Sequence, residues 1–216
     1  CNNMKDNVFF VSGIDTNVGK SYATGYLAKT WNEQGVRTIT QKFIQTGNVG
    51  MSEDIELHRK IMGTGLLPED ESGLTMPEIF TYPCSPHLAA EIDHRPIDFD
   101  KIEKATRQLS ETYDAVLLEG AGGLMVPLTR DLLTIDYVAQ KNYPLIFVTS
   151  GKLGSINHTL LSLEAVTRRG IRLHTVAYNL FPEEDDDIIR RDTEAYIRDL
   201  LAKEYPETHF VIVPKL

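Results

Sequence analysis

The sequence is poor in the residues and segments that mark several classes of protein. It has two cysteines, Cys1 and Cys84, which are too few for a disulfide framework and lead us to expect a reducing, cytoplasmic location. No apolar run approaches the ~20 residues that span a bilayer, and the opening CNNMKDN lacks the apolar core of a signal peptide. Basic residues number 22 against 31 acidic ones, and this net charge of −9 argues against nucleic acid as a general partner.

What the chain does have is an alternation of short apolar runs with amphipathic segments. Strands are predicted at 8–12, 37–43, 115–120, 145–150, 174–179 and 209–214, mostly as the continuous apolar runs of strands covered on both faces. Helices are predicted at 20–34, 52–62, 86–94, 99–113, 134–142, 156–169 and 187–204. This alternation implies parallel crossovers, so we predict an α/β three-layer sandwich with a mostly parallel central sheet. We expect one domain over 1–216, with 1–7 as a disordered or extraneous start.

Local signals mark the ends of several elements. Ser85 and Asp98 each precede a predicted helix and are expected to cap it. The segment 64–84 is rich in glycine, proline and acidic residues and is predicted to be a long loop. The acidic run 183–187 is interpreted as a solvated helix start, which the helix dipole favours.

The stretch SGIDTNVGKS, residues 12–21, has the features of a phosphate-binding loop. It follows an apolar strand and opens a helix, where backbone N–H groups can bind phosphate oxygens. Gly13 and Gly19 enclose five residues, one more than the strict pattern. In this role Lys20 would reach the β- and γ-phosphates and the Ser21 hydroxyl would bind Mg²⁺. An ordinary strand–turn–helix connection is the alternative, and the flanking elements favour the phosphate site.

Glu119 is a candidate ligand-binding acid because of its position at the end of a strand. It follows the apolar run 115–118 and precedes Gly120, Gly122 and Gly123. Ligands of open parallel sheets bind at this edge, and glycines allow a close approach of the backbone. A solvated strand-end acid followed by a tight turn is the alternative.

Lys42 lies within the apolar strand that begins the stretch QKFIQTGNVG, residues 41–50. If this ammonium is buried it requires an anion, whereas on an edge strand it would face water. Thr46 starts the loop after this strand, and Asp54 lies in the first turn of the next predicted helix. Asp54 is therefore a candidate metal-side acid, although an acid in a first helical turn is common without any such role.

Taken together, these motifs resemble those of the dethiobiotin synthases, the ATP-dependent enzymes of biotin synthesis, which have a P-loop NTPase fold. The resemblance extends from about residue 8 to residue 216. It is carried by GIDTNVGKS (13–21), QKFIQTG (41–47), SED (52–54), SPH (85–87), EGAGGLMVPL (119–128), GKLGSINHTLL (151–161) and VAYN (176–179). The family's phosphate loop has the same five-residue spacing, so the unusual spacing supports the resemblance.

The resemblance implies an ATP- and Mg²⁺-dependent reaction of CO₂ or bicarbonate with 7,8-diaminononanoate. A carbamate forms on one amine, is phosphorylated by ATP, and is attacked by the second amine, which closes the cyclic urea of dethiobiotin and leaves ADP and phosphate. A homodimer with the substrate at its interface is also implied, without nucleic acid or membrane as partners.

The resemblance further implies roles for particular residues. Catalysis would use Thr16, Lys20, Lys42 and Thr46, and Mg²⁺ would be held by Ser21, Asp54 and Glu119. ATP would be bound by Asn17, Val18, Gly19, Lys20, Ser21, Tyr22, Asp54, Glu119, Gly120, Ala121 and Gly122, with Asn179 and Pro214 at the adenine. The organic substrate would be bound by Thr46, Ser85, Pro86, Leu153, Gly154, Ser155 and Asn157, and by Tyr196 of the second subunit.

The sequence departs from the family pattern at four of these places. Phe43 follows Lys42 where the family usually has proline, and proline would fix the backbone there. Asn17 stands where glutamate is frequent, Ser21 replaces threonine, and Thr46 stands where serine is usual. The last two changes keep a hydroxyl group.

Three other classes of protein are weighed at this stage. Related ATP-dependent amidoligases share the loop and sheet but commonly carry an added glutaminase domain. Partition-type ATPases have an extra lysine early in the loop, where this chain has Ile14 and Asp15. Dinucleotide-dependent oxidoreductases need a G-x-G-x-x-G fingerprint that does not follow the first strand here. Cys84 is interpreted as structural, and five histidines without metal-ligand spacing as structural or exposed: His58, His94, His158, His174 and His209.

Overall fold

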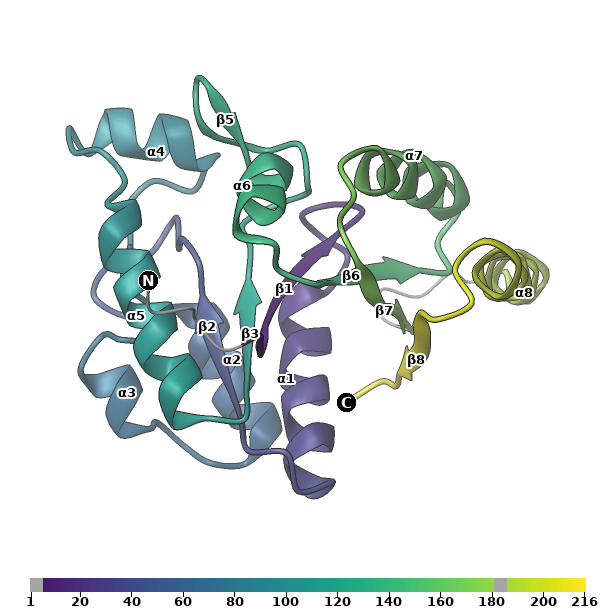
Figure 1. The fold of residues 1–216 in the computed structure, drawn as a ribbon, viewed down its shortest axis with the longest axis horizontal. Coiled ribbons are helices and arrows are strands. Elements are labelled where there is room, and N and C mark those ends of the chain that lie inside the picture. The colour runs from purple at the N-terminus through teal and green to yellow at the C-terminus, as the bar shows by residue number, and fades with distance from the viewer. Residues whose placement is uncertain (1–5, 181–185) are drawn as a thin grey trace.

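The computed structural model describes residues 6–180 and 186–216, and a parallel sheet forms its centre (Figure 1). Its six strands pair in the order β2-β3-β1-β6-β7-β8, and every pairing is parallel. Their bounds are Thr38–Lys42 (β2), Ala115–Glu119 (β3), Val8–Gly13 (β1), Leu145–Ser150 (β6), Leu173–Asn179 (β7) and His209–Val213 (β8). All six predicted strands are confirmed, with ends shifted by at most one residue.

The predicted helices are also found. Their bounds are Lys20–Glu33 (α1), Glu53–Met62 (α2), Pro86–Ile92 (α4), Phe99–Thr112 (α5), Thr134–Lys141 (α6), Ser155–Arg168 (α7) and Asp187–Glu204 (α8). The Asp98 side chain accepts a hydrogen bond from the Lys101 N–H, so this predicted cap is confirmed. Ser52, predicted as the first residue of its helix, instead precedes α2 as a cap and accepts a hydrogen bond from the Ile55 N–H. Within the described parts of the chain, no helix combines the length and apolar character needed to cross a bilayer.

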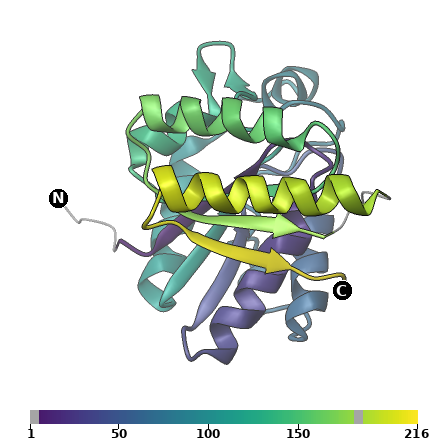
Figure 2. The ribbon, with the colours of Figure 1, turned by 90° about the vertical axis from the view of Figure 1, so that its right-hand side faces the viewer.

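Helices cover both faces of the sheet, which confirms the three-layer arrangement. Figure 2 shows α7 and α8 on one side of β7 and β8 and α1 on the other. Successive strand residues alternate between two apolar clusters: Phe10 and Leu118 face the layer of α5 to α8, whereas Val11 and Leu117 face α1. Both faces are therefore buried, which explains why these strands are continuous apolar runs.

The structure corrects several details of the sequence analysis. Ser85 makes no capping bond to α4, and its hydroxyl instead lies 3.0 Å from the His87 Nδ1 atom. The helix predicted at 86–94 ends at Ile92, because the Asp93 carboxylate turns back to accept two hydrogen bonds from Thr81.

Three short elements were missed, and the start of the fold was placed too late. The expected loop 64–84 contains the short helix α3 (Pro68–Glu71), and an antiparallel hairpin, β4 (Pro127–Thr129) and β5 (Leu132–Leu133), precedes α6. Asn7, assigned to a disordered start, is held by hydrogen bonds from its side-chain amide to the Ser110 and Tyr113 carbonyls. Most of the acidic run 183–187 lies outside the described residues, and Asp186 caps α8.

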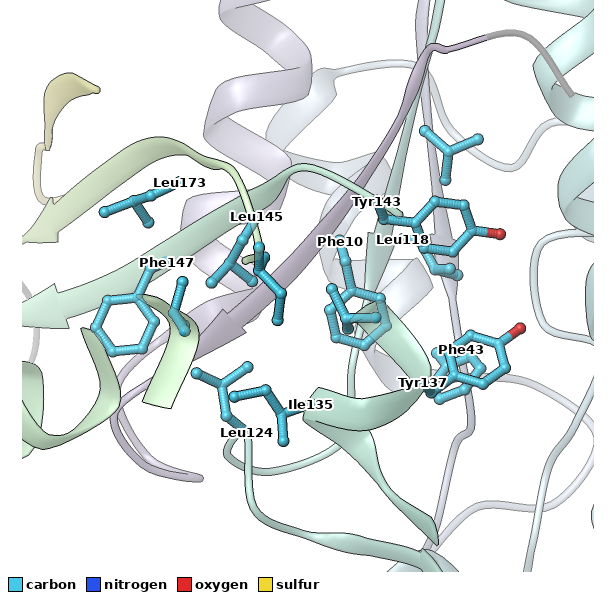
Figure 3. Packing of buried hydrophobic residues seen from close by; sticks show 14 of the residues in the cluster. Phe10, Phe43, Leu118, Leu124, Ile135, Tyr137, Tyr143, Leu145, Phe147 and Leu173 are labelled. Carbon is cyan, nitrogen blue, oxygen red and sulfur yellow. The ribbon is translucent and has the colours of Figure 1, made fainter. Parts of the chain in front are cut away.

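The packing of Phe43 in the core fixes the backbone at a position where proline would fix it through its ring. Its N–H donates to the Glu119 carbonyl (2.9 Å), a bond that proline could not make. Its fully buried ring packs against Phe10 and Tyr137, with ring centroids 5.5 and 4.8 Å away (Figure 3). The backbone that follows Lys42 is therefore fixed by the core.

We expect Phe43→Ala to lower the free energy of unfolding by about 3–5 kcal/mol, because it removes a fully buried ring. Chemical denaturation of the purified protein measures this change. Val49→Ala serves as the control, since Val49 is 82% exposed and its truncation should change stability by less than about 0.5 kcal/mol. Equal stability of the two variants would contradict the role assigned to Phe43.

Candidate active site

The phosphate-type loop connects β1 to α1 in a conformation that requires glycine. A Cβ atom on Gly13 would lie 2.7 Å from Val18 Cγ1 and 3.0 Å from the Val148 carbonyl oxygen, so the loop closes on itself only without one. Gly19 has a φ of 86° and precedes α1, where no side chain of the described residues makes a cap. The first N–H groups of α1 are thus suited to an anion.

Three neighbouring strands bring polar side chains to the same edge as this loop. Lys42 and Glu119 are register partners at the ends of β2 and β3, and Glu119 is also level with Val11 of β1. The ends of these strands border a cavity of about 530 Å³. Its lining includes twelve of the predicted site residues: Thr16, Asn17, Gly19, Lys20, Ser21, Tyr22, Lys42, Thr46, Asp54, Glu119, Ala121 and Gly122.

Lys42 and Glu119 form a buried ion pair at the floor of this cavity. The Lys42 Nζ atom lies 2.9 Å from Glu119 Oε2 and 2.7 Å from Asp54 Oδ2, and it donates to the Gly120 carbonyl. Burial opposes the charge on Lys42, but Glu119 and Asp54 more than offset it and raise the pKa of Lys42 above its ordinary value. The anion that a buried Lys42 requires is therefore supplied by two carboxylates.

Glu119 remains ionised although it is fully buried. Burial alone would raise its pKa, but Lys42 and His58 hold the pKa of Glu119 well below its ordinary value. Its Oε2 atom also accepts a hydrogen bond from the Ser21 hydroxyl (3.0 Å). Glu119 thus links the phosphate-type loop to Lys42 through a single oxygen.

Lys20 is the second cation of the cavity. Its Nζ atom donates to the Asp15 carbonyl (3.2 Å), and the side chain is mostly buried. Burial lowers the pKa of Lys20 to about 8; the charge of Glu119 opposes this shift and that of Lys42 adds to it. A buried ammonium with a neutral carbonyl as its hydrogen-bond acceptor is well prepared to receive an anionic ligand.

The sequence analysis missed several residues of this cavity and its wall. Ile44, Gln45, Glu53 and Leu57 line the cavity beside the predicted residues. His58 was interpreted as structural or exposed; it is fully buried and its Nε2 atom lies 3.0 Å from Glu119 Oε1. The spacing of Asp54 and His58, one helical turn apart, was the available signal, because such residues share one face of a helix.

A second cavity of about 180 Å³ lies on the other side of the loop. It is lined by Ile14, Asp15, Asn17, Val18, Ser150, Lys152, Leu153, Gly154, Ser155 and His158. The predicted substrate residues 153–155 therefore come next to the loop, where α7 begins after Gly154. Asn17 lines both cavities.

The remaining predicted residues line neither of these two cavities. Ser85 and Pro86 start α4, Asn157 lies on the exposed side of α7, and Tyr196 of α8 is 47% exposed. Pro214 follows β8 immediately after Val213, the register partner of Asn179.

Asn179 connects the end of β7 to the phosphate-type loop. Its amide nitrogen donates to the Val18 and Gly19 carbonyls, each at 3.2 Å, and the residue is buried. These contacts attach the loop to the end of β7. They were not expected, because Asn179 was predicted to bind the adenine of ATP.

A metal site can be tested against the donors present here. Within residues 6–180 and 186–216, no group of three or more histidine, cysteine, aspartate or glutamate side chains is arranged to hold a metal ion. Ser21, Asp54 and Glu119 offer one hydroxyl and two carboxylates, which are the hard oxygen donors that Mg²⁺ prefers. This set fits an ion that takes its other ligands from phosphates and water.

Solved structures with a similar fold define the class. The MinC:MinD cell division complex of Aquifex aeolicus matches 97% of this chain and 82% of its own, with a TM-score of 0.57 and 12% identity. The pNOB8 ParA protein bound to nonspecific DNA matches 97% and 85%, with a TM-score of 0.56 and 12% identity. At this identity the likeness shows the fold alone, and together with the loop at residues 12–21 it defines a protein with the P-loop NTPase fold.

Sequence relatives are more specific. The family model described as an AAA domain matches residues 7–216. The ATP-dependent dethiobiotin synthetase BioD 2 of Pasteurella multocida is 52% identical over 95% of this chain and 96% of its own length. The protein of the same name from Haemophilus influenzae is 57% identical over 85% and 96%. The chain belongs to the family of ATP-dependent dethiobiotin synthetases.

We expect Asn179→Ala to weaken nucleotide binding about tenfold, because it removes two hydrogen bonds that hold the loop, each contributing about 0.5–1.5 kcal/mol. Calorimetric titration with ATP and with GTP measures the loss. Since the bonds are made to the loop backbone, both nucleotides should lose affinity alike. A loss confined to ATP would instead assign Asn179 to adenine recognition.

Proposed function

We propose that this chain is an ATP-dependent dethiobiotin synthetase that converts 7,8-diaminononanoate and CO₂ to dethiobiotin in biotin synthesis. The observation that carries the proposal is the meeting of Lys20, Lys42, Asp54 and Glu119 in one cavity beside the phosphate-type loop. The reaction needs such a site, because it brings an anionic carbamate against the anionic γ-phosphate of ATP. Buried cations that are already in place reduce this repulsion without reorganisation.

In the proposed reaction, one amine of the substrate adds to CO₂ and loses a proton, which gives a carbamate. A carbamate oxygen attacks the γ-phosphorus of ATP, and ADP leaves. The second amine then attacks the carbamoyl carbon of the mixed anhydride, loses its proton, and displaces phosphate as the ring closes. Each step is a displacement or an addition, so positioning and charge neutralisation are the main tasks of the protein.

The roles of the side chains follow from their places in the cavity. Lys20 would bind the phosphates, since it lies at the end of the loop and its ammonium donates to the neutral Asp15 carbonyl. Lys42 would neutralise the carbamate and the transferred phosphoryl group from the end of β2. Thr16 would donate to the γ-phosphate or carbamate from the loop, and Thr46 would orient the diamine from the end of the cavity near β2.

Ser21, Asp54 and Glu119 would hold Mg²⁺. The ion would offset the charge of the β- and γ-phosphates. Lys42 now balances both carboxylates. With a divalent cation held by these carboxylates, the charge of Lys42 would be available to the carbamate.

The second cavity suits the carboxylate of the substrate. The N-terminus of α7 borders it, and a helix N-terminus favours an anion. We further propose a homodimer in which Asn157 and Tyr196 contact the substrate across the interface. The exposed Leu153 and Leu161 of this region, 74% and 60% accessible, support an apolar contact there.

The proposal is tested by incubating the protein with Mg-ATP, bicarbonate and 7,8-diaminononanoate and measuring dethiobiotin by mass spectrometry. We expect product only when every component is present, because each supplies atoms or energy to the ring. Hydrolysis of ATP without dethiobiotin would overturn the proposed reaction and leave a nucleotide site of another function.

We expect Lys42→Ala to lower turnover at least about 100-fold, because it removes a preorganised charge at the reacting groups. ATP affinity should change little, since Lys20 and the loop remain. Steady-state kinetics and calorimetry with ATP separate the two effects. Lys42→Arg is the companion variant. It keeps the positive charge but changes the shape of the side chain, so it separates the effect of charge from the effect of geometry. Retained turnover in Lys42→Ala would remove Lys42 from the mechanism.

A further inference from the structure

A chain of buried polar side chains runs from Glu119 into the layer of α2. The His58 Nε2 atom lies 3.0 Å from Glu119 Oε1, and its Nδ1 atom lies 2.7 Å from the Thr40 hydroxyl. The Arg59 guanidinium donates to the same hydroxyl (2.7 Å) and, through two other nitrogens, to both carboxylate oxygens of Asp70 at 2.8 Å. All five side chains are essentially inaccessible to solvent.

The hydrogen bonds of this chain determine where the proton of His58 lies. The ionised Glu119 carboxylate only accepts, so His58 Nε2 must carry a hydrogen. The Thr40 hydroxyl has one hydrogen, and it already accepts from Arg59, which only donates. With Nε2 as the donor to Glu119, the Thr40 hydroxyl can in turn donate its own hydrogen to His58 Nδ1.

This arrangement fixes which oxygen of Glu119 faces the cavity. His58 holds Oε1, while Oε2 contacts Lys42 and Ser21. A carboxylate without the His58 bond could rotate and offer either oxygen or both. His58 itself is fully buried and reaches the cavity only through Glu119.

We propose that His58 is a positioning residue for Glu119. His58 donates from Nε2 to Glu119 Oε1 and so orients the carboxylate to present Oε2 to the metal and phosphates. This inference rests on the proposed function, because that function assigns Mg²⁺ as the ligand of Glu119. Groups that orient a metal-binding carboxylate in this way typically affect metal affinity or activity about 10- to 100-fold.

The position of His58 on α2 adds a second consequence. Asp54 and His58 are one turn apart, and they contact Lys42 and Glu119 respectively. The next residue, Arg59, connects the same turn of α2 to Asp70 of α3. The two carboxylates of the cavity are therefore held relative to each other through one helix.

The test compares His58→Leu, which removes the donor, with His58→Gln, whose amide nitrogen can donate to Glu119. His174→Leu is the matched control, because it makes the same change in a histidine that packs against Phe9 and Trp31. Two quantities are measured for each: Mn²⁺ binding by electron paramagnetic resonance with a non-hydrolysable ATP analogue, and the Mg²⁺ dependence of dethiobiotin formation.

We expect His58→Leu to weaken Mn²⁺ binding and raise the half-saturating Mg²⁺ concentration about 10- to 100-fold. The KM for 7,8-diaminononanoate should stay unchanged, because His58 does not line either cavity. His58→Gln should restore most of the loss, and His174→Leu should behave as the unaltered protein. Unchanged Mn²⁺ binding in His58→Leu, or an equal loss in His58→Gln, would overturn the proposal.

Nitrogen NMR of the histidine side chains tests the same inference on the unaltered protein, even if His58→Leu does not fold. The His58 signals, identified by their loss in His58→Gln, should show a protonated Nε2. An unprotonated Nε2 would overturn the proposal. Absence of dethiobiotin from the unaltered protein would reject the proposed function, whereas product formation with an unprotonated Nε2 would reject only the role of His58.

Discussion

The site depends on one buried ammonium. Lys42 is only 4% exposed, and burying an isolated charge costs several kcal/mol, so the protein must provide its counter-charges before any ligand arrives. Glu119 and Asp54 provide them from β3 and α2. A slip of β2 by one residue would turn Lys42 to the opposite face of the sheet. The ion pair between Lys42 and Glu119 therefore depends on the register of β2 and β3, and it stabilises that register. The contacts that balance the charge of Lys42 also bring together the side chains that line the cavity.

The helix α2 shows how this constraint extends beyond the cavity. Asp54 completes the charge balance of Lys42, and His58 satisfies the oxygen of Glu119 that Lys42 does not reach. The buried Arg59 guanidinium also requires an anion, and Asp70 of α3 accepts two hydrogen bonds from it. The acidic segment that follows α2 thus has a structural task, because it closes a line of buried charges that begins at the site.

The sequence was sufficient for the sheet, the helices and most of the cavity, since these follow from local patterns. Apolar runs located every strand of the main sheet, and the strand ends placed Lys42 and Glu119 at one edge. The contact of His58 with Glu119 joins residues far apart in the chain, so it depends on how α2 packs on the sheet and leaves no local pattern. Ser85 was misjudged for a related reason: its hydroxyl finds His87, and the capping pattern alone could not reveal that competitor.

The strand order explains why a cavity lies on each side of the same loop. β1 lies between β3 and β6 in the sheet. After β1, the chain forms β2 and β3 on one side of it, and only later forms β6, β7 and β8 on the other side. Such a switch point opens a crevice at the end of the strand, and the loop from Gly13 to Gly19 divides it. Toward β3 lies the cavity of Lys42 and Glu119, and toward β6 lies the smaller one at the start of α7. Under the proposed function, this division would keep the carboxylate of the substrate away from the γ-phosphate that its carbamate must meet. The specificity of the reaction would then lie in the side chains at the strand ends, where Lys42 would bring positive charge to the reacting groups and Glu119 holds Lys42 in place.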